Sequence, residues 1–141
     1  MRPLVLDTNI VLDLFVFRDE RAAALRQVLE GGGACWLATA AMRDEFARVL
    51  DYEQIAPRLR FHGLQATAVL EAFDRHVQVA PAPLKATVTC ADPDDQKFID
   101  LAVARRAVLL SKDRAVLAMG KRLARLEVVA RPVFAPDLLT A

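Results

Sequence analysis

The stretch PLVLDTN (residues 3–9) sets a short, continuously apolar run directly before a carboxylate, and similar runs recur along the chain. They lie at residues 4–6, 35–37, 108–110 and 127–129, with segments of helical periodicity between them. Alternation of this kind is typical of βα units around a parallel sheet. Because the runs are apolar throughout, helices should cover the strands on both faces. The sequence therefore predicts a three-layer α/β/α fold with a central, mostly parallel sheet.

Helical periodicity predicts six helices around these strands. Three glycines at residues 31–33 supply a C-terminal stop for the second helix. The segment 77–89 holds two prolines and is expected to carry a short strand and a connector. No repeat or linker interrupts the pattern, and 141 residues is a common size for one domain, so a single domain spanning 1–141 is predicted. The predicted helices are 9–17, 20–30, 40–50, 63–76, 93–105 and 114–124.

Composition narrows the class of protein. The chain is 55% hydrophobic and 26% charged, which favours a compact globular fold over disorder. No apolar run approaches the roughly 20 residues needed to cross a bilayer, and Asp7 comes too early for a signal-peptide core, so a cytoplasmic protein without a membrane partner is expected. Cys35 and Cys90 lie far apart without a CxxC pair, so both are expected to be reduced and buried. The net charge of +1 names no partner.

Carboxylates come after two of the predicted strands. Asp7 stands directly after the run at 4–6, and Asp113 stands three residues beyond the run at 108–110. In open α/β sheets ligands bind beyond the carboxyl ends of the strands, so both acids should be directed toward a shared cleft. Each of them taken alone is also compatible with a cap of the next helix.

A further group of acids opens the predicted helix 93–105. The run Asp92-Pro93-Asp94-Asp95 is typical of a helix start, with proline at the first position and acids in the first turn. At 100° per residue, Asp95 projects within the apolar arc of this helix, whereas Asp100 points toward water. Asp94 lies near the other flank of that arc. Helix phase therefore leaves open whether Asp94 or Asp95 is functional.

An acid in the predicted helix 40–50 has two interpretations. Glu45 lies at the edge of the buried face of this helix, while Asp44 lies on the solvent side. A carboxylate at that edge is suited to reach a cleft. The alternative is a partly solvated acid that pairs with Arg43 or Arg48.

In order and spacing, these motifs resemble those of the PIN-domain nucleases, and within them the VapC-like branch of toxin components from bacterial toxin–antitoxin pairs. The resemblance covers nearly the whole chain and rests on VLDTN at 5–9, EF at 45–46 with VL at 49–50, DPDDQKF at 92–98 and SKD at 111–113. Lys112 stands where glycine is frequent in this branch. Carried over residue by residue, the resemblance implies a catalytic and metal-binding set of Asp7, Glu45, Asp95 and Asp113, supported by Thr8, Asn9, Asp92 and Ser111.

The resemblance implies an Mg²⁺- or Mn²⁺-dependent ribonuclease. Mg²⁺ prefers oxygen ligands, and a divalent ion would remove the repulsion among converging acids, so the site should be poorly formed without metal. The ion would lower the pKa of a coordinated water and orient it for in-line attack on a phosphodiester. Asp7, Asp95 and Asp113 are the expected ligands, with Glu45 holding a second ion or orienting the water. Whether Asp92 or Asp94 also contacts metal stays open.

The resemblance also bears on partners. It implies an RNA substrate and a cognate antitoxin, and homodimers are common in the family. RNA phosphates would meet cations near the acids, although Lys and Arg on helices are usually only solvated surface. Trp36 falls inside a predicted strand, so it is expected in the core and not as a platform for bases. The cations nearest the acids in sequence are Arg43, Lys97, Lys112 and Arg114.

Three alternatives stay open. An aspartyl-phosphate mechanism would use Asp7 as nucleophile, but the haloacid-dehalogenase-like pattern expects a second Asp where Asn9 stands, and a receiver-like domain gives no reason for an inward Glu45. A catalytically silent PIN-like module that binds RNA or protein would be signalled by a lost acid, and none is evidently lost. A housekeeping RNA-processing nuclease would use the same chemistry as a toxin.

Overall fold

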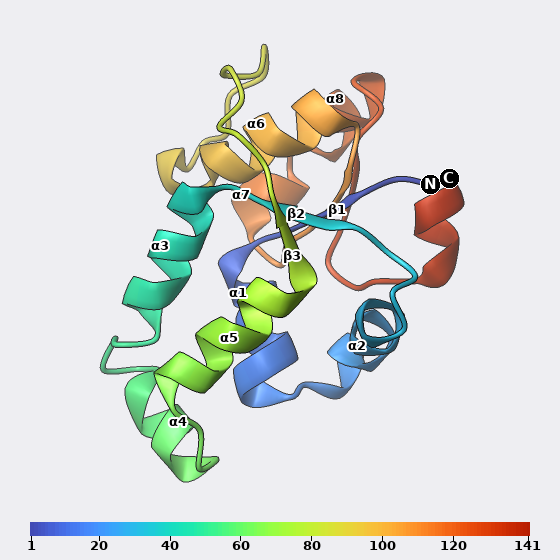
Figure 1. Ribbon diagram of the computed structural model, residues 1–141. Helices are drawn as coiled ribbons and strands as arrows, with labels where there is room; N and C mark the ends of the chain where they lie inside the picture. Colours follow the sequence, from blue (N-terminus) through green and yellow to red (C-terminus); the bar gives the residue numbers. More distant parts are fainter.

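The computed structural model describes residues 1–141 and contains a five-stranded sheet of order β3-β2-β1-β4-β5 (Figure 1). All four strand pairs are parallel. This confirms the predicted three-layer α/β/α fold with its parallel sheet. The strands are β1 (Leu4–Leu6), β2 (Trp36–Ala38), β3 (Val77–Val79), β4 (Val108–Leu110) and β5 (Val129–Arg131).

Helices flank both faces of the sheet. In Figure 1, α6 and α8 lie above the strands, and α1, α2 and α5 lie below them. Short 3-10 turns occupy Glu20–Ala22, Pro93–Asp95 and Pro136–Thr140. The α-helices are α1 (Thr8–Leu12), α2 (Ala23–Glu30), α3 (Ala40–Val49), α4 (Ala56–Phe61), α5 (Ala66–His76), α6 (Gln96–Arg105), α7 (Arg114–Leu117) and α8 (Gly120–Arg125).

The core explains why the strand runs are uniformly apolar. Every residue of β1, β2 and β4 is buried, as expected for strands covered on both faces. Trp36 is only 1% exposed, which confirms its predicted place in the core. The register pairs Leu6 of β1 with Leu110 of β4, and the Asp7 amide donates to the Leu110 carbonyl over 2.9 Å. The chain segments after these two strands therefore leave the sheet side by side.

Several predicted boundaries were wrong for local backbone reasons. The predicted strand 127–129 begins two residues later, because Glu127 has a left-handed φ of 64° and cannot extend a strand. The predicted helix 114–124 is divided into α7 and α8. Helix α4, with a proline in its first turn, was not predicted, because residues 51–62 show no clear apolar periodicity.

The first predicted helix, 9–17, changes geometry part-way. It is α-helical only over Thr8–Leu12 and continues as a π-helical segment, Asp13–Phe17, which ends at Arg18 with φ 50°. π-Helical turns are rare and shift the phase of the side chains after them. Asp13, at the start of this segment, is only 8% exposed.

The cysteine prediction was half right. Both thiols are free and Cys90 is buried, but Cys35 is exposed. The reason is that β2 begins one residue later than predicted, at Trp36, so Cys35 lies in the preceding loop. None of the helices combines the length and the apolarity that crossing a membrane requires.

Candidate functional site

Asp7 sits between β1 and α1 at the carboxyl edge of the sheet. It occupies the N-cap position of α1, yet its side chain makes no capping hydrogen bond. Instead, Asp7 Oδ2 accepts a hydrogen bond of 2.6 Å from the Ser111 hydroxyl, and the residue is 5% exposed. Burial raises the pKa of the Asp7 carboxyl, and the nearby Asp113 and Glu45 carboxylates add to this, against the Ser111 hydrogen bond. Asp7 is therefore an acid held inside the protein and not a helix cap.

Asp113 combines the two roles considered for it. Its Oδ1 accepts from the Ala115 amide over 2.8 Å and so caps α7. Its own amide donates to the Ser111 hydroxyl oxygen over 3.1 Å. Ser111, which is fully buried, thus joins the two acids that come after the central strands β1 and β4. One buried hydroxyl fixes the relative position of Asp7 and Asp113.

Asp95 is a second buried acid of this group. It is 7% exposed, and its Oδ2 is buried without a hydrogen-bond partner. Burial, followed by the negative charges of Asp7 and Asp113, raises the pKa of Asp95 to about 7. Asp94 is exposed, so Asp95 is the inward acid of this pair, as helix phase predicted.

Asp95 and two other carboxylates lie close enough together to hold one metal ion. Oxygen atoms of Asp92, Asp95 and Asp113 lie within 4.8 Å of one another. Asp92 also accepts from the Asp94 amide over 3.0 Å and caps the 3-10 turn that leads into α6. Asp92 was predicted as a supporting residue, with contact to metal left open, and its distance to the other two carboxylates makes it a candidate ligand.

Glu45 reaches the same region from α3. Its Oε2 accepts from the Thr8 hydroxyl over 2.7 Å, and its Oε1 lies 3.1 Å from the Lys97 ammonium. The alternative pairing with Arg43 or Arg48 does not occur: Arg43 pairs with Asp74 at 2.7 Å, and Arg48 makes no ion pair. Glu45 is therefore held at the cleft by two residues from other elements.

A cleft of about 320 Å³ brings these residues together. Asp7, Glu45, Asp95 and Asp113 all line it, although they come from four separate segments of the chain. Thr8 and Asn9, predicted as supporting residues, line it as well. Tyr52 and Gln54 also line the cleft, and they were not predicted because they lie in an aperiodic loop after α3.

A family model described as "PIN domain" matches residues 3–115. The chain belongs to the PIN domain family. PIN domains are generally metal-dependent nucleases, and the matched region contains all four predicted acids. No curated protein matches the chain.

The donor set of this PIN domain fits a hard divalent cation. All its candidate ligands are carboxylate oxygens, which Mg²⁺ and Mn²⁺ prefer, and no thiol or imidazole lines the cleft. The buried Asp95 Oδ2 lacks a partner, and an ion would provide one. A cation would also offset the mutual repulsion that raises the pKa of Asp95.

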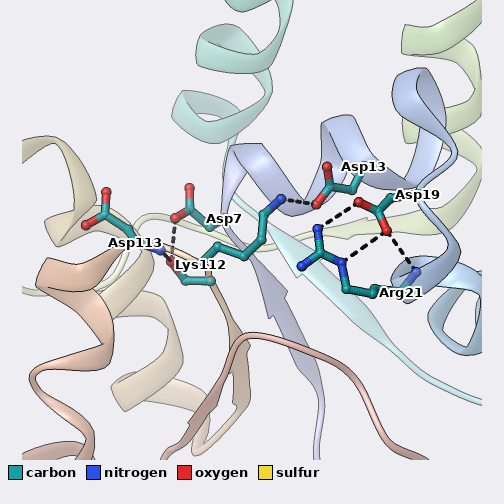
Figure 2. A network of polar contacts seen from close by, with 7 residues as sticks. Asp7, Asp13, Asp19, Arg21, Lys112 and Asp113 are labelled. Carbon is teal, nitrogen blue, oxygen red and sulfur yellow. Dashed lines mark hydrogen bonds and ion pairs between the residues drawn. The ribbon is translucent and has the colours of Figure 1, made fainter.

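The four cations predicted to meet RNA phosphates are placed differently in the PIN domain. Only Lys97 contacts an acid of the cleft. Arg43 pairs with Asp74, and Arg114 is exposed and makes no ion pair. Figure 2 shows Lys112 extending away from Asp113 toward Asp13, with which it pairs.

The prediction that Asp100 faces water was wrong, because the residue is half-buried. Its Oδ1 accepts hydrogen bonds from the Ala86 amide over 2.9 Å and from the Gln96 side chain over 2.8 Å. The connector between β3 and α6 folds over α6. Helical phase cannot predict that a distant segment covers one face of a helix. Asp100 thus anchors the connector of the PIN domain.

Proposed function

We propose that this PIN domain is a metal-dependent endoribonuclease that cleaves RNA phosphodiester bonds in the cytoplasm. Its catalytic residues would be Asp7, Glu45, Asp95 and Asp113. The observation that carries the proposal is the Asp95 carboxylate, which is buried beside other acids with one oxygen unpartnered. A residue in a cleft whose pKa is strongly shifted by burial and by neighbouring charges is a candidate functional residue.

The residues divide the work in this proposal. Bound Mg²⁺ or Mn²⁺ would supply an activated water and would stabilise negative charge on the phosphate. Asp7, Asp95 and Asp113 would hold the metal, and Asp92 is a further candidate ligand. Ser111 keeps Asp7 oriented through its 2.6 Å hydrogen bond. Such partners of metal ligands fix the direction in which the ligand points.

Glu45 lines the cleft and pairs with Lys97 at 3.1 Å. Thr8 donates to one oxygen of Glu45, and Lys97 lies beside the other, so the carboxylate has a fixed direction. Glu45 would orient the attacking water. The Lys97 ammonium brings positive charge to the acids and would bind a phosphate oxygen of the RNA.

The biological role proposed for this nuclease is the toxin of a toxin–antitoxin pair. This part rests on the motif resemblance to VapC-like proteins. It includes a cognate antitoxin and a homodimer as partners. Expression of the chain in bacteria should then arrest growth, and Asp7→Asn should relieve the arrest. A housekeeping RNA-processing nuclease would cleave RNA without arresting growth.

The decisive test of the activity is cleavage of a structured bacterial RNA pool by purified protein with Mg²⁺ or Mn²⁺. Asparagine keeps the shape of the Asp7 side chain and removes its charge, so Asp7→Asn should abolish cleavage, as should EDTA. Asp19→Asn is the matched control, because Asp19 lies outside the cleft and pairs with Arg21. Folded, metal-loaded protein that cleaves none of several RNAs would instead favour a PIN-like binding module.

A further inference from the structure

We propose that Tyr52 and Gln54 form a nucleobase subsite, which binds one base of single-stranded RNA beside the phosphate held by the acids. This inference rests on the proposed ribonuclease function. It assigns a ligand to the part of the cleft that metal chemistry does not explain.

The cleft has an apolar side that a metal ion does not need. Leu12, Val49 and Ile55 line the cleft together with Tyr52. A divalent ion with its waters requires only the carboxylates and a polar surface. A flat, largely apolar ligand beside the phosphate accounts for the apolar side, and a nucleobase has that shape and polarity.

The backbone of the loop holds Tyr52 while its ring stays accessible. The Tyr52 amide donates to Val49 over 3.0 Å, and its carbonyl accepts from Ile55 and Ala56 over 2.9 and 2.8 Å. The residue is nonetheless 50% exposed. An aromatic ring on a fixed backbone loses little conformational freedom when a base stacks on it.

The two acids of the loop are not among the residues that line the cleft. Tyr52 and Gln54 line the cleft, whereas Asp51 and Glu53 do not. Gln54 is exposed and carries both a donor and an acceptor, which can pair with the edge of an unstacked base. The two inward side chains thus provide a stacking face and a hydrogen-bonding group at one place.

Tyr52 is also the only aromatic residue that lines the cleft. Trp36 is 1% exposed and unavailable for stacking, and Phe61, although 83% exposed, lies outside the cleft on α4. Proteins that bind single-stranded RNA commonly stack its bases on exposed aromatic rings. Phe61 therefore provides a matched control: an exposed aromatic residue on the same stretch of chain, away from the acids.

The first experiment uses the fact that the chain contains a single tyrosine. Protein labelled with 3-fluorotyrosine gives one ¹⁹F resonance, and Asp7→Asn prevents cleavage during titration. A short single-stranded RNA should shift this resonance, and an abasic oligomer of equal length should not. An unchanged resonance, or an equal shift with the abasic oligomer, would overturn the subsite. Either of these outcomes would favour another occupant of the apolar side, such as a protein partner.

The second experiment separates the subsite from the activity. Tyr52→Ala should raise the KM for RNA by about 5- to 150-fold with little change in kcat, the loss expected from one stacked base. Tyr52→Phe should restore most of it, and Phe61→Ala should behave as wild type. Wild-type cleavage with an unchanged KM in Tyr52→Ala would refute the subsite alone. Absence of wild-type cleavage would refute the proposed function, and the ¹⁹F titration would still decide the subsite.

Discussion

Figure 2 shows two groups of carboxylates that differ in their partners. Asp13 and Asp19 pair with cations, and Asp7 and Asp113 do not. Asp13 pairs with Lys112, and Asp19 pairs with Arg21 at 3.0 Å. Asp7, on the other side of Lys112, has a hydroxyl as its hydrogen-bond partner and no cation. The chain neutralises Asp13 and Asp19 with its own cations and leaves Asp7 without one.

The pKa values of Asp19 and Asp95 shift in opposite directions, in line with this difference in partners. Hydrogen bonds from Arg21 lower the pKa of Asp19 to about 2, whereas burial and then neighbouring acids raise the pKa of Asp95 to about 7. Both residues are aspartates near one edge of one sheet. The partner of an acid, and not its position alone, therefore separates a structural carboxylate from a candidate metal ligand.

The largest expected effect is on activity. Asp95→Asn and Asp113→Asn should each reduce cleavage of RNA by more than about 100-fold, because each removes a charge from the proposed metal site. Mutating a residue that only hydrogen-bonds to a metal ligand already lowers metal affinity or activity by about 10- to 100-fold. Asp19→Asn should leave the rate unchanged. A rate assay on the three variants checks this. Equal losses in all three would erase the distinction between the two groups.

Ser111→Ala should have the next largest effect. It removes the hydroxyl that joins Asp7 and Asp113 without touching a charge. We expect about a 10- to 100-fold loss of metal affinity or activity and a loss of about 1 to 2 kcal/mol in the free energy of unfolding. Ser111→Thr, which keeps the hydroxyl, is the control. A Ser111→Ala variant with wild-type activity would show that Asp7 is positioned by something else.

Stability without metal should depend on pH in opposite ways for the two groups. Between its ordinary pKa of 3.8 and about 7, folded Asp95 keeps a proton that the unfolded chain has lost, so stability should fall as the pH rises through this range. The Asp19 contribution is present above 3.8 and should be lost as the pH falls toward about 2.

Denaturant titrations in EDTA across this range measure the effect. Asp95→Asn should flatten the decline between about pH 4 and pH 7 and should be more stable than wild type at the upper end. A wild-type slope that persists in Asp95→Asn would assign the decline to another group.

The smallest effect is expected at the paired acids. Arg21 is 67% exposed, so water and salt screen its pairing with Asp19, and Arg21→Ala should change the free energy of unfolding very little. RNA cleavage should not change. Thermal melts and the cleavage assay together check this, and a loss of activity would connect the paired group to the catalytic cleft.

Much of this organisation could be predicted from the sequence. Apolar runs define β1 and β4, and the carboxyl ends of parallel strands meet at one edge of the sheet, so Asp7 and Asp113 could be placed together. Helical phase placed Glu45 at the rim of α3 and Asp95 on the inner face. These features depend on local pattern and strand polarity, which a single sequence records.

The missed features depend on contacts between distant segments. Asp13, which pairs with Lys112, begins the π-helical segment after α1, and no residue pattern indicated that segment. The burial of Asp100 depends on the connector that covers it. Tyr52 lies in a loop whose path is determined by packing and not by periodicity.

The central claim is that the unpaired acids bind a divalent cation and the paired acids do not. Titration calorimetry with Mn²⁺ on folded protein at pH 8 tests it directly, with wild type, Asp95→Asn and Asp19→Asn compared. Wild type and Asp19→Asn should bind Mn²⁺ with equal affinity, and Asp95→Asn should bind at least about tenfold more weakly. Equal binding by Asp95→Asn and wild type, or no binding by any of the three, would contradict the claim.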